Sequence, residues 1–139
     1  MDPWLDPRRF LPHHPPMVLL DRFCPVSAEE VRAEWRVPSG GPWVRNGSLA
    51  RSALVEVAAQ AIAAGAGHAG SADGPRPVPG VLGALNSVRF RGSARPGDLL
   101  TAVARVGLRY ERFLRVSFAV ESGGSVLCEG EMTLSTTTG

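Results

Sequence analysis

The stretch "NGSLARSALVEVAAQAIAAGAGHAG", residues 46–70, decides the fold expected for this chain. From residue 48 to about residue 66 it contains mostly Ala, Leu, Val and Ile and no proline, which predicts one long helix. Arg51 and Glu56 are the only charged residues before this run ends. A helix with so few charges is covered on most of its circumference, so the rest of the chain must supply the cover.

Strand-like runs flank this helix on both sides in the sequence. Residues 29–38, "EEVRAEWRVP", alternate between apolar and charged side chains, which is typical of a half-buried strand. The apolar run at residues 17–27 precedes it and predicts the other half of a hairpin. Four more strands are expected after the helix, at residues 81–92, 99–110, 111–122 and 125–137. The order predicts an α+β fold in which a curved antiparallel sheet wraps around the helix.

Length and composition indicate one globular domain over residues 1–139, with residues 1–16 as an irregular, proline-rich lead-in. Hydrophobic residues make up 44% of the chain and charged residues 20%, values that do not fit a disordered protein. The net charge of +2 is too small to indicate a nucleic-acid partner.

Several other classes are excluded by what the chain lacks. It has no apolar run long enough to span a bilayer and no secretory signal at its start, so a cytoplasmic protein without a membrane partner is expected. Cys24 and Cys128 form no CxxC pair and have no histidines at metal-ligand spacing. No metal site is therefore expected.

Glu56 is the residue of the helix that most needs an explanation. Together with Ser52 and Gln60 it is spaced i, i+4, i+8, which predicts a narrow polar line opposite a broad apolar face. One interpretation is structural: the carboxylate lies in solvent or pairs with an arginine such as Arg89. The other is a general acid or base, because a desolvated carboxylate on a rigid helix is how proteins tune such a group.

Three segments resemble a known family. "LPHHPPMVLLDRF" (11–23) is similar to the "LPHRYPFLLVDR" strand of hotdog-fold 3-hydroxyacyl-acyl-carrier-protein dehydratases. "LVEVAAQA" (54–61) is similar to "IVEAMAQA" of their central helix, and "SVRFRGSARPGDLL" (87–100) to their "ARFRRPVVPGDQL". Order and spacing agree from about residue 11 to residue 136. The resemblance implies the hotdog fold, a long helix wrapped by an antiparallel sheet.

The resemblance also implies an activity. In that family the active site lies at a dimer interface, where a histidine of one subunit and the helix glutamate of the other remove water from a β-hydroxyacyl thioester. Glu56 corresponds to that glutamate. The substrate is carried on the phosphopantetheine arm of an acyl carrier protein, so that protein is an expected partner and no separate cofactor is implied.

The family's histidine has no counterpart here. At its spacing from the glutamate stands Pro42, followed by Trp43. In this respect the chain resembles the divergent dehydratase-like subunits of aryl polyene and related type II polyketide systems, which work beside a second hotdog dehydratase. The resemblance therefore implies a heterodimer whose partner supplies the histidine, with a homodimer as the alternative.

Other residues are candidates for binding or for replacing the missing base. His13 is a weak catalytic candidate, because it aligns with a histidine of the family's first motif that is not the catalytic one. Arg89 and Arg91 are candidates for guiding the carrier's arm, although an exposed strand face explains them equally well. Gln60 and Asn46 complete the candidate substrate-binding or carrier-binding residues; Asn46 is also a turn residue and, like Ser48, a candidate N-cap.

The function expected is dehydration of carrier-bound 3-hydroxyacyl chains in polyene polyketide or fatty-acid-type biosynthesis. Two alternatives stay open. The chain can be a non-catalytic subunit that stabilises an active partner, which the missing histidine favours. It can also be a hotdog thioesterase, in which the helix carboxylate activates water against the thioester, since the fold does not determine the function.

Overall fold

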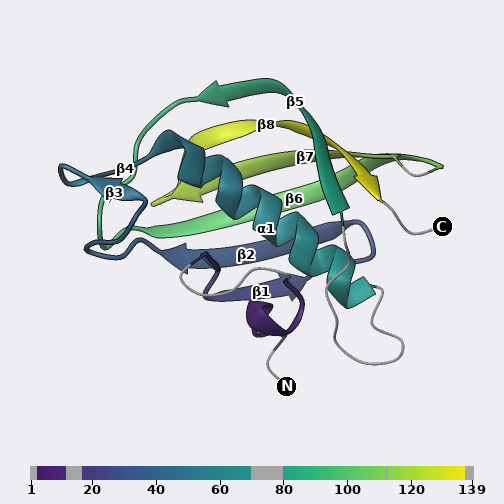
Figure 1. Ribbon diagram of the computed structural model, residues 1–139, viewed down its shortest axis with the longest axis horizontal. Helices are drawn as coiled ribbons and strands as arrows, with labels where there is room; N and C mark the ends of the chain where they lie inside the picture. Colours follow the sequence, from purple (N-terminus) through teal and green to yellow (C-terminus); the bar gives the residue numbers. More distant parts are fainter. Residues whose placement is uncertain (1–2, 12–16, 70–79, 112, 137–139) are drawn as a thin grey trace.

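The computed structural model describes residues 3–11, 17–69, 80–111 and 113–136. Figure 1 shows one long helix lying across one face of a curved sheet. In chain order the elements are η1 (Pro7–Arg9), β1 (Arg22–Pro25), β2 (Glu30–Arg36), β3 (Val44–Arg45), β4 (Ser48–Leu49), α1 (Arg51–Ala69), β5 (Gly80–Phe90), β6 (Leu99–Tyr110), β7 (Phe113–Ser122) and β8 (Ser125–Thr136).

The large sheet has six strands in the order β1-β2-β6-β7-β8-β5, and each strand is antiparallel to its neighbours. β1 and β2 form the predicted hairpin, and the four predicted strands after the helix are β5 to β8. β5 does not pair with β4 or β6, the strands next to it in sequence. It pairs with β8 and forms the edge of the sheet opposite β1. The predicted α+β arrangement of a sheet around one helix is confirmed.

The core lies between the sheet and α1, which packs mainly against β2, β6 and β1. Side chains from both layers are completely covered there, among them Phe23, Ala33, Ala53, Val57, Ala61, Leu100, Val120, Cys128 and Met132. The alternation in β2 is as predicted, with Val31, Ala33 and Trp35 buried. Period-two burial in the strands and a broad buried arc on the helix therefore form one contiguous core.

The helix begins three residues later than predicted. Ser48 and Leu49 pair with Val44 and Arg45 as a two-stranded hairpin, so α1 begins at Arg51. Neither Asn46 nor Ser48 is therefore positioned to cap it, and that prediction was wrong. The residue types of this segment favour a first helical turn, but the segment pairs as a strand instead.

The first strand is shorter than predicted. Residues 17–21 were expected to be part of a strand, but β1 contains only Arg22–Pro25. The backbone of Met17 and Leu19 instead bonds to the side chain of Gln60 on α1. Residues 17–19 are thus held against the helix, whereas the N–H of Asp21 still donates to the carbonyl oxygen of Glu34 on β2 at 2.8 Å.

Candidate functional site

Glu56 lies in the second turn of α1, at the border between the buried and the exposed sides of the helix. Ala53 and Val57, next to it on the buried side, have no exposed surface, whereas Ser52 on the other side is exposed. Glu56 itself is half-buried. The carboxylate is therefore partly withdrawn from water and still accessible at the surface of the subunit, as a group that acts on a substrate must be.

The side-chain amide of Gln60 links Glu56 to the segment before β1. The backbone N–H of Leu19 donates to Oε1 of Gln60 at 2.9 Å. Nε2 of Gln60 donates to the carbonyl oxygen of Met17 at 2.7 Å and to Oε1 of Glu56 at 3.0 Å. Gln60 is fully buried, and it is the buried polar residue of the described core.

The polar line predicted along α1 does not face outward as a whole. Ser52 is exposed, Glu56 is half-buried and Gln60 is completely buried. The line runs beneath residues 17–20, because the backbone groups of Met17 and Leu19 bond to the Gln60 amide there. The spacing of the three residues indicated a shared side of the helix, but it carried no signal for a segment more than forty positions away that covers one end.

The loop before α1, where the family's histidine would stand, is a tight hairpin. Pro42 is exposed, and Arg45 and Ser48 face each other across a two-residue turn. Asn46 and Gly47 form this turn with φ angles of 52° and 72°, which is the type I′ geometry that Asn-Gly favours. Asn46 thus has the turn position considered for it; its role in binding stays a prediction.

Trp43 stands beside this hairpin and carries an unusual polar atom. Its Nε1 is buried and finds no hydrogen-bond acceptor in the described part of the chain. Its carbonyl oxygen accepts a bond from the N–H of Ala50 at 2.8 Å, which fixes the residue next to the start of α1. In the sequence, Trp43 stands out only as the neighbour of Pro42, since no residue pattern indicates an indole without an acceptor.

Arg89 and Arg91 lie on the side of the sheet that faces away from α1. Arg89 is opposite Glu129 in the β5–β8 ladder, while the next pair, Phe90 and the buried Cys128, lies on the side of α1, where the guanidinium of Arg51 is over the exposed Phe90 ring. Arg91 forms an ion pair with Glu129, its Nε donating at 2.8 Å. The structure therefore does not bring these arginines to Glu56, and a role for them toward the carrier protein stays a prediction.

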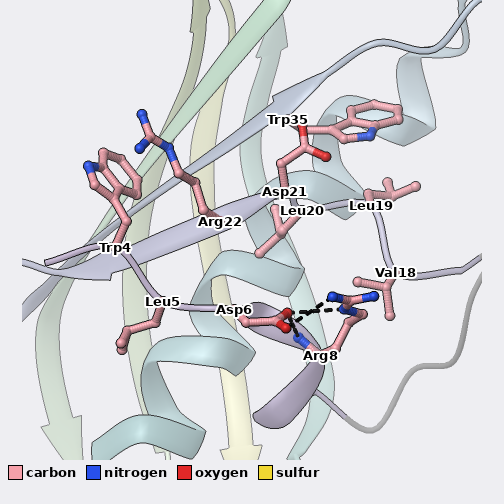
Figure 2. A pocket seen from close by; sticks show the side chains of 10 residues that line it. All are labelled: Trp4, Leu5, Asp6, Arg8, Val18, Leu19, Leu20, Asp21, Arg22 and Trp35. Carbon is pink, nitrogen blue, oxygen red and sulfur yellow. Dashed lines mark hydrogen bonds and ion pairs between the residues drawn. The ribbon is translucent and has the colours of Figure 1, made fainter. Parts of the chain in front are cut away.

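A small hollow of about 320 Å³ accompanies Arg89 on that outer face, and a larger one of about 670 Å³ lies at the other edge of the sheet. Figure 2 shows the larger pocket, between the residues before β1 and the N-terminal segment, with Arg22 stacked over Trp4 at 4.1 Å. Asp6 accepts hydrogen bonds from Arg8, which hold the pKa of its carboxyl below the usual value. Neither pocket includes Glu56. In the larger one Arg8 pairs with Asp6 and Arg22 with Glu34, and the carboxylate of Asp21 accepts a hydrogen bond from the backbone N–H of Arg36.

The remaining predictions concern His13, metals and membranes. His13 lies outside the described residues. Within residues 3–11, 17–69, 80–111 and 113–136 no group of His, Cys, Asp or Glu is placed to hold a metal ion. No helix in the same ranges is long and apolar enough to cross a bilayer.

Comparison with known proteins identifies the family. The model of the ApeP dehydratases matches residues 5–137. The chain belongs to the ApeP dehydratase family. The resemblance found in three short motifs is thereby confirmed, including the expectation of a divergent dehydratase. No match was found among curated protein sequences.

Solved structures support the same assignment. The ApeP-like chain is similar to the dehydratase heterocomplex ApeI:P from Xenorhabdus doucetiae, at 27% identity and a TM-score of 0.85, covering 96% of this chain and 92% of that one. The PaaI protein of E. coli (16% identity, TM-score 0.64, 79% and 74% covered) shares the fold. So does a hypothetical thioesterase of Streptococcus pneumoniae with coenzyme A (14%, 0.64, 78% and 82%). The hotdog fold is confirmed.

Proposed function

We propose that this chain is one subunit of a dehydratase that removes water from 3-hydroxyacyl chains on an acyl carrier protein during polyene biosynthesis. The match to the ApeP dehydratase family over residues 5–137 is the observation that carries this proposal. The acyl chain arrives on the phosphopantetheine arm of the carrier, so this subunit has to provide a surface and acid–base groups, and no cofactor of its own.

The reaction requires two titratable groups. A base takes the α-proton, the electron pair of the Cα–H bond becomes the new double bond, and the Cβ–O bond breaks. An acid gives a proton to the departing hydroxyl, which leaves as water. Glu56 is one of the two groups, because it is half-buried, fixed on a rigid helix and held by the Gln60 amide.

The second group comes from another subunit. Within the hairpin loop, Pro42 and Trp43 occupy the place of the family's histidine, and the turn at Asn46 and Gly47 adds no acid or base. The similar ApeI:P protein of Xenorhabdus doucetiae is a dehydratase heterocomplex, which supports a partner for this chain as well. A second hotdog dehydratase that carries the histidine completes the site.

Two surfaces of the described structure suit such a partner. Val55, Ala59 and Ala63 are apolar and only half-buried on the outward side of α1, where a helix facing water is normally polar. At the edge of the sheet, β5 exposes 44% of Leu85 and 38% of Phe90. A partner that extends the sheet from β5 would cover apolar groups that are now open.

The experiment compares the wild-type complex with its Glu56→Gln variant. The chain is purified alone and together with a hotdog dehydratase that carries the histidine, and each preparation is given a 3-hydroxyacyl carrier protein. We expect enoyl product from the wild-type complex and a turnover lower by about 10²-fold or more with Glu56→Gln, the usual contribution of one acid–base group. Glu131→Gln is the matched control, since Glu131 is also half-buried but lies on the outer face of the sheet.

Each alternative has its own outcome. Activity of the chain without its partner would overturn the shared site. Full activity of the Glu56→Gln complex would identify a non-catalytic stabilising subunit. Release of free acid in place of an enoyl product would identify a thioesterase.

A further inference from the structure

The end of the molecule where α1 begins concentrates positive charge. Two segments meet there, residues 38–55 and 87–97, because the N–H of Leu49 donates to the carbonyl oxygen of Ala94 at 2.9 Å. Neither segment contains an aspartate or a glutamate, whereas the net charge of the whole chain is only +2. Their basic residues are Arg45, Arg51, Arg89, Arg91 and Arg95.

Three of these residues, Arg45, Arg51 and Arg95, form what we call the arginine surface. Arg45 lies on β3, Arg51 is the first residue of α1, and Arg95 follows the residue that bonds to β4; all three are exposed. Among the described residues, no carboxylate pairs with any of the three side chains. Asp98 lies nearby, but it accepts the backbone N–H of Arg95 at 2.9 Å and not the guanidinium.

The stability of the helix does not explain an arginine at its first position. The N-terminus of a helix carries a partial positive charge, so a cation there is unfavourable, and the first turn of α1 contains no acidic residue. The guanidinium of Arg51 lies over the ring of Phe90, 5.4 Å from its centroid, and this contact leaves the charge in place. An anionic group from outside the chain would balance it.

Other exposed arginines are neutralised within the chain. Each pairs with a carboxylate: Arg91 with Glu129 at 2.7 Å, Arg109 with Glu29 at 3.7 Å and Arg115 with Glu131 at 3.8 Å. Arg109 and Arg115 flank the turn between β6 and β7, and Figure 1 shows this turn at the end of the molecule opposite to the start of α1. The unpaired state of the arginine surface is therefore not a general property of arginines in this chain.

We infer that the acyl carrier protein docks on the arginine surface, so that this subunit, and not the one that carries the histidine, holds the carrier. The inference rests on the proposed function. A phosphodiester joins the phosphopantetheine arm to its carrier, so the carrier presents a negative charge where the arm begins, and arginine suits such a group. Glu56 lies in the second turn of α1, which places the arginine surface at the end of the helix nearest to the reacting group.

The β3–β4 hairpin gains a role from this arrangement. It stands where the family's histidine loop would be, and it supplies neither an acid nor a base. In its place it presents Arg45 toward solvent. The two subunits then divide the work, one giving the histidine and the other giving Glu56 and the surface for the carrier.

The double variant Arg45→Gln/Arg95→Gln tests the inference in the complex with the histidine-bearing subunit. Both side chains are exposed, so the fold should be kept, and Arg51 is left in place because it contacts Phe90. kcat/KM is measured for one 3-hydroxyacyl chain on the carrier protein and on pantetheine, which has neither phosphate nor protein. We expect the ratio of the two values to fall about fivefold or more, through KM for the carrier, because exposed charges guide association.

Arg109→Gln/Arg115→Gln is the matched control. It removes the same charge at the opposite end of the molecule, from arginines that are also exposed. The ratio should stay within about twofold of the wild type, since exposed ion pairs contribute little. Equal losses in the two double variants would overturn the inference. So would an equal loss on the carrier and on the pantetheine substrate.

A binding measurement separates this inference from the proposed chemistry. The complex is titrated in a calorimeter with carrier protein whose arm bears no acyl chain. We expect Arg45→Gln/Arg95→Gln to raise the Kd about fivefold or more, and the difference from the wild type to shrink at about 1 M salt, where charges are screened within about 3 Å. An unchanged Kd would contradict the docking surface. A fully active Glu56→Gln complex would instead remove the proposed role of Glu56 and leave this change in Kd in place.

Discussion

The two cysteines differ in how readily they react. Cys128 has no exposed surface, and burial, together with the nearby charge of Glu129, raises the pKa of its thiol to about 11. The thiolate is the reactive form, so Cys128 stays protonated and protected at pH 8, whereas Cys24 on β1 is half-buried. We expect iodoacetamide at pH 8 to alkylate Cys24 at least about tenfold faster, measured by peptide mass spectrometry.

Unfolding the chain provides the control for this prediction. In denaturant both cysteines lose their surroundings and should be alkylated at similar rates. Rapid labelling of Cys128 in the native chain would mean that the sheet opens beneath α1, contrary to the packing of this core.

Single residues of the site were predictable to different degrees. Glu56 stands out in the sequence, because a carboxylate on an otherwise apolar helix is uncommon and has to be satisfied. The burial of Gln60 was not predictable, because its partners are backbone groups of Met17 and Leu19, and backbone groups leave no trace in residue type. The sequence shows which side chains can act as acids, bases or hydrogen-bonding groups. The contacts that orient these side chains depend on how segments distant in the sequence pack together.

At the scale of elements, the bulge in β5 requires a glycine in the neighbouring strand. The register between β5 and β8 shifts between Asn86 and Arg89, and Val88 then lies over Gly130. A Cβ at Gly130 would be 2.9 Å from the Cα of Val88 and 3.3 Å from Cζ of Phe118. We expect Gly130→Ala to lower the free energy of unfolding by about 1–3 kcal/mol, measured by urea unfolding, because neither backbone nor ring can move away freely.

Gly107→Ala separates this clash from the general effect of replacing a strand glycine. A Cβ at Gly107 would meet only the Arg115 carbonyl oxygen at 3.7 Å, an ordinary contact. That variant should be neutral or slightly stabilised, since alanine restricts the unfolded chain more than glycine does. Equal losses in both variants would contradict the role given to the bulge.

The sequence predicted the elements better than their ends. One helix and six strands were expected in this order, and Gly123 and Gly124 marked the turn between β7 and β8; the short β3–β4 hairpin was not predicted. The errors lie at residues 17–21 and 48–50, where local residue types favoured a longer strand and an earlier helix. In both places a contact outside the segment decided the outcome: the Gln60 amide in the first, and pairing with Val44 and Arg45 in the second.

At the scale of the molecule, the two edges of the sheet differ in whether other backbone covers them. β1 is short, and Leu5 covers it through reciprocal backbone hydrogen bonds with Phe23 at 2.7 and 3.1 Å. β5 has eleven residues, and no described strand pairs with its outer side. A long open edge with exposed apolar side chains invites pairing with another chain, so proteins normally cover or block it. β5 forms the edge opposite β1, although β6, β7 and β8 follow it in the sequence, and the residues of β5 do not by themselves indicate this position.

This difference between the edges predicts where the partner subunit binds. Leu85, 44% exposed on β5, should lie in the interface, and Leu85→Asp should raise the Kd for the partner about tenfold or more, measured by titration calorimetry. Leu108→Asp is the control, because Leu108 is 56% exposed on β6, which β7 and β8 separate from β5. Both variants place the same charge on an exposed strand, so only the edge distinguishes them. Weak binding by Leu108→Asp with normal binding by Leu85→Asp would move the partner to the β6–β7 hairpin and leave β5 without its cover.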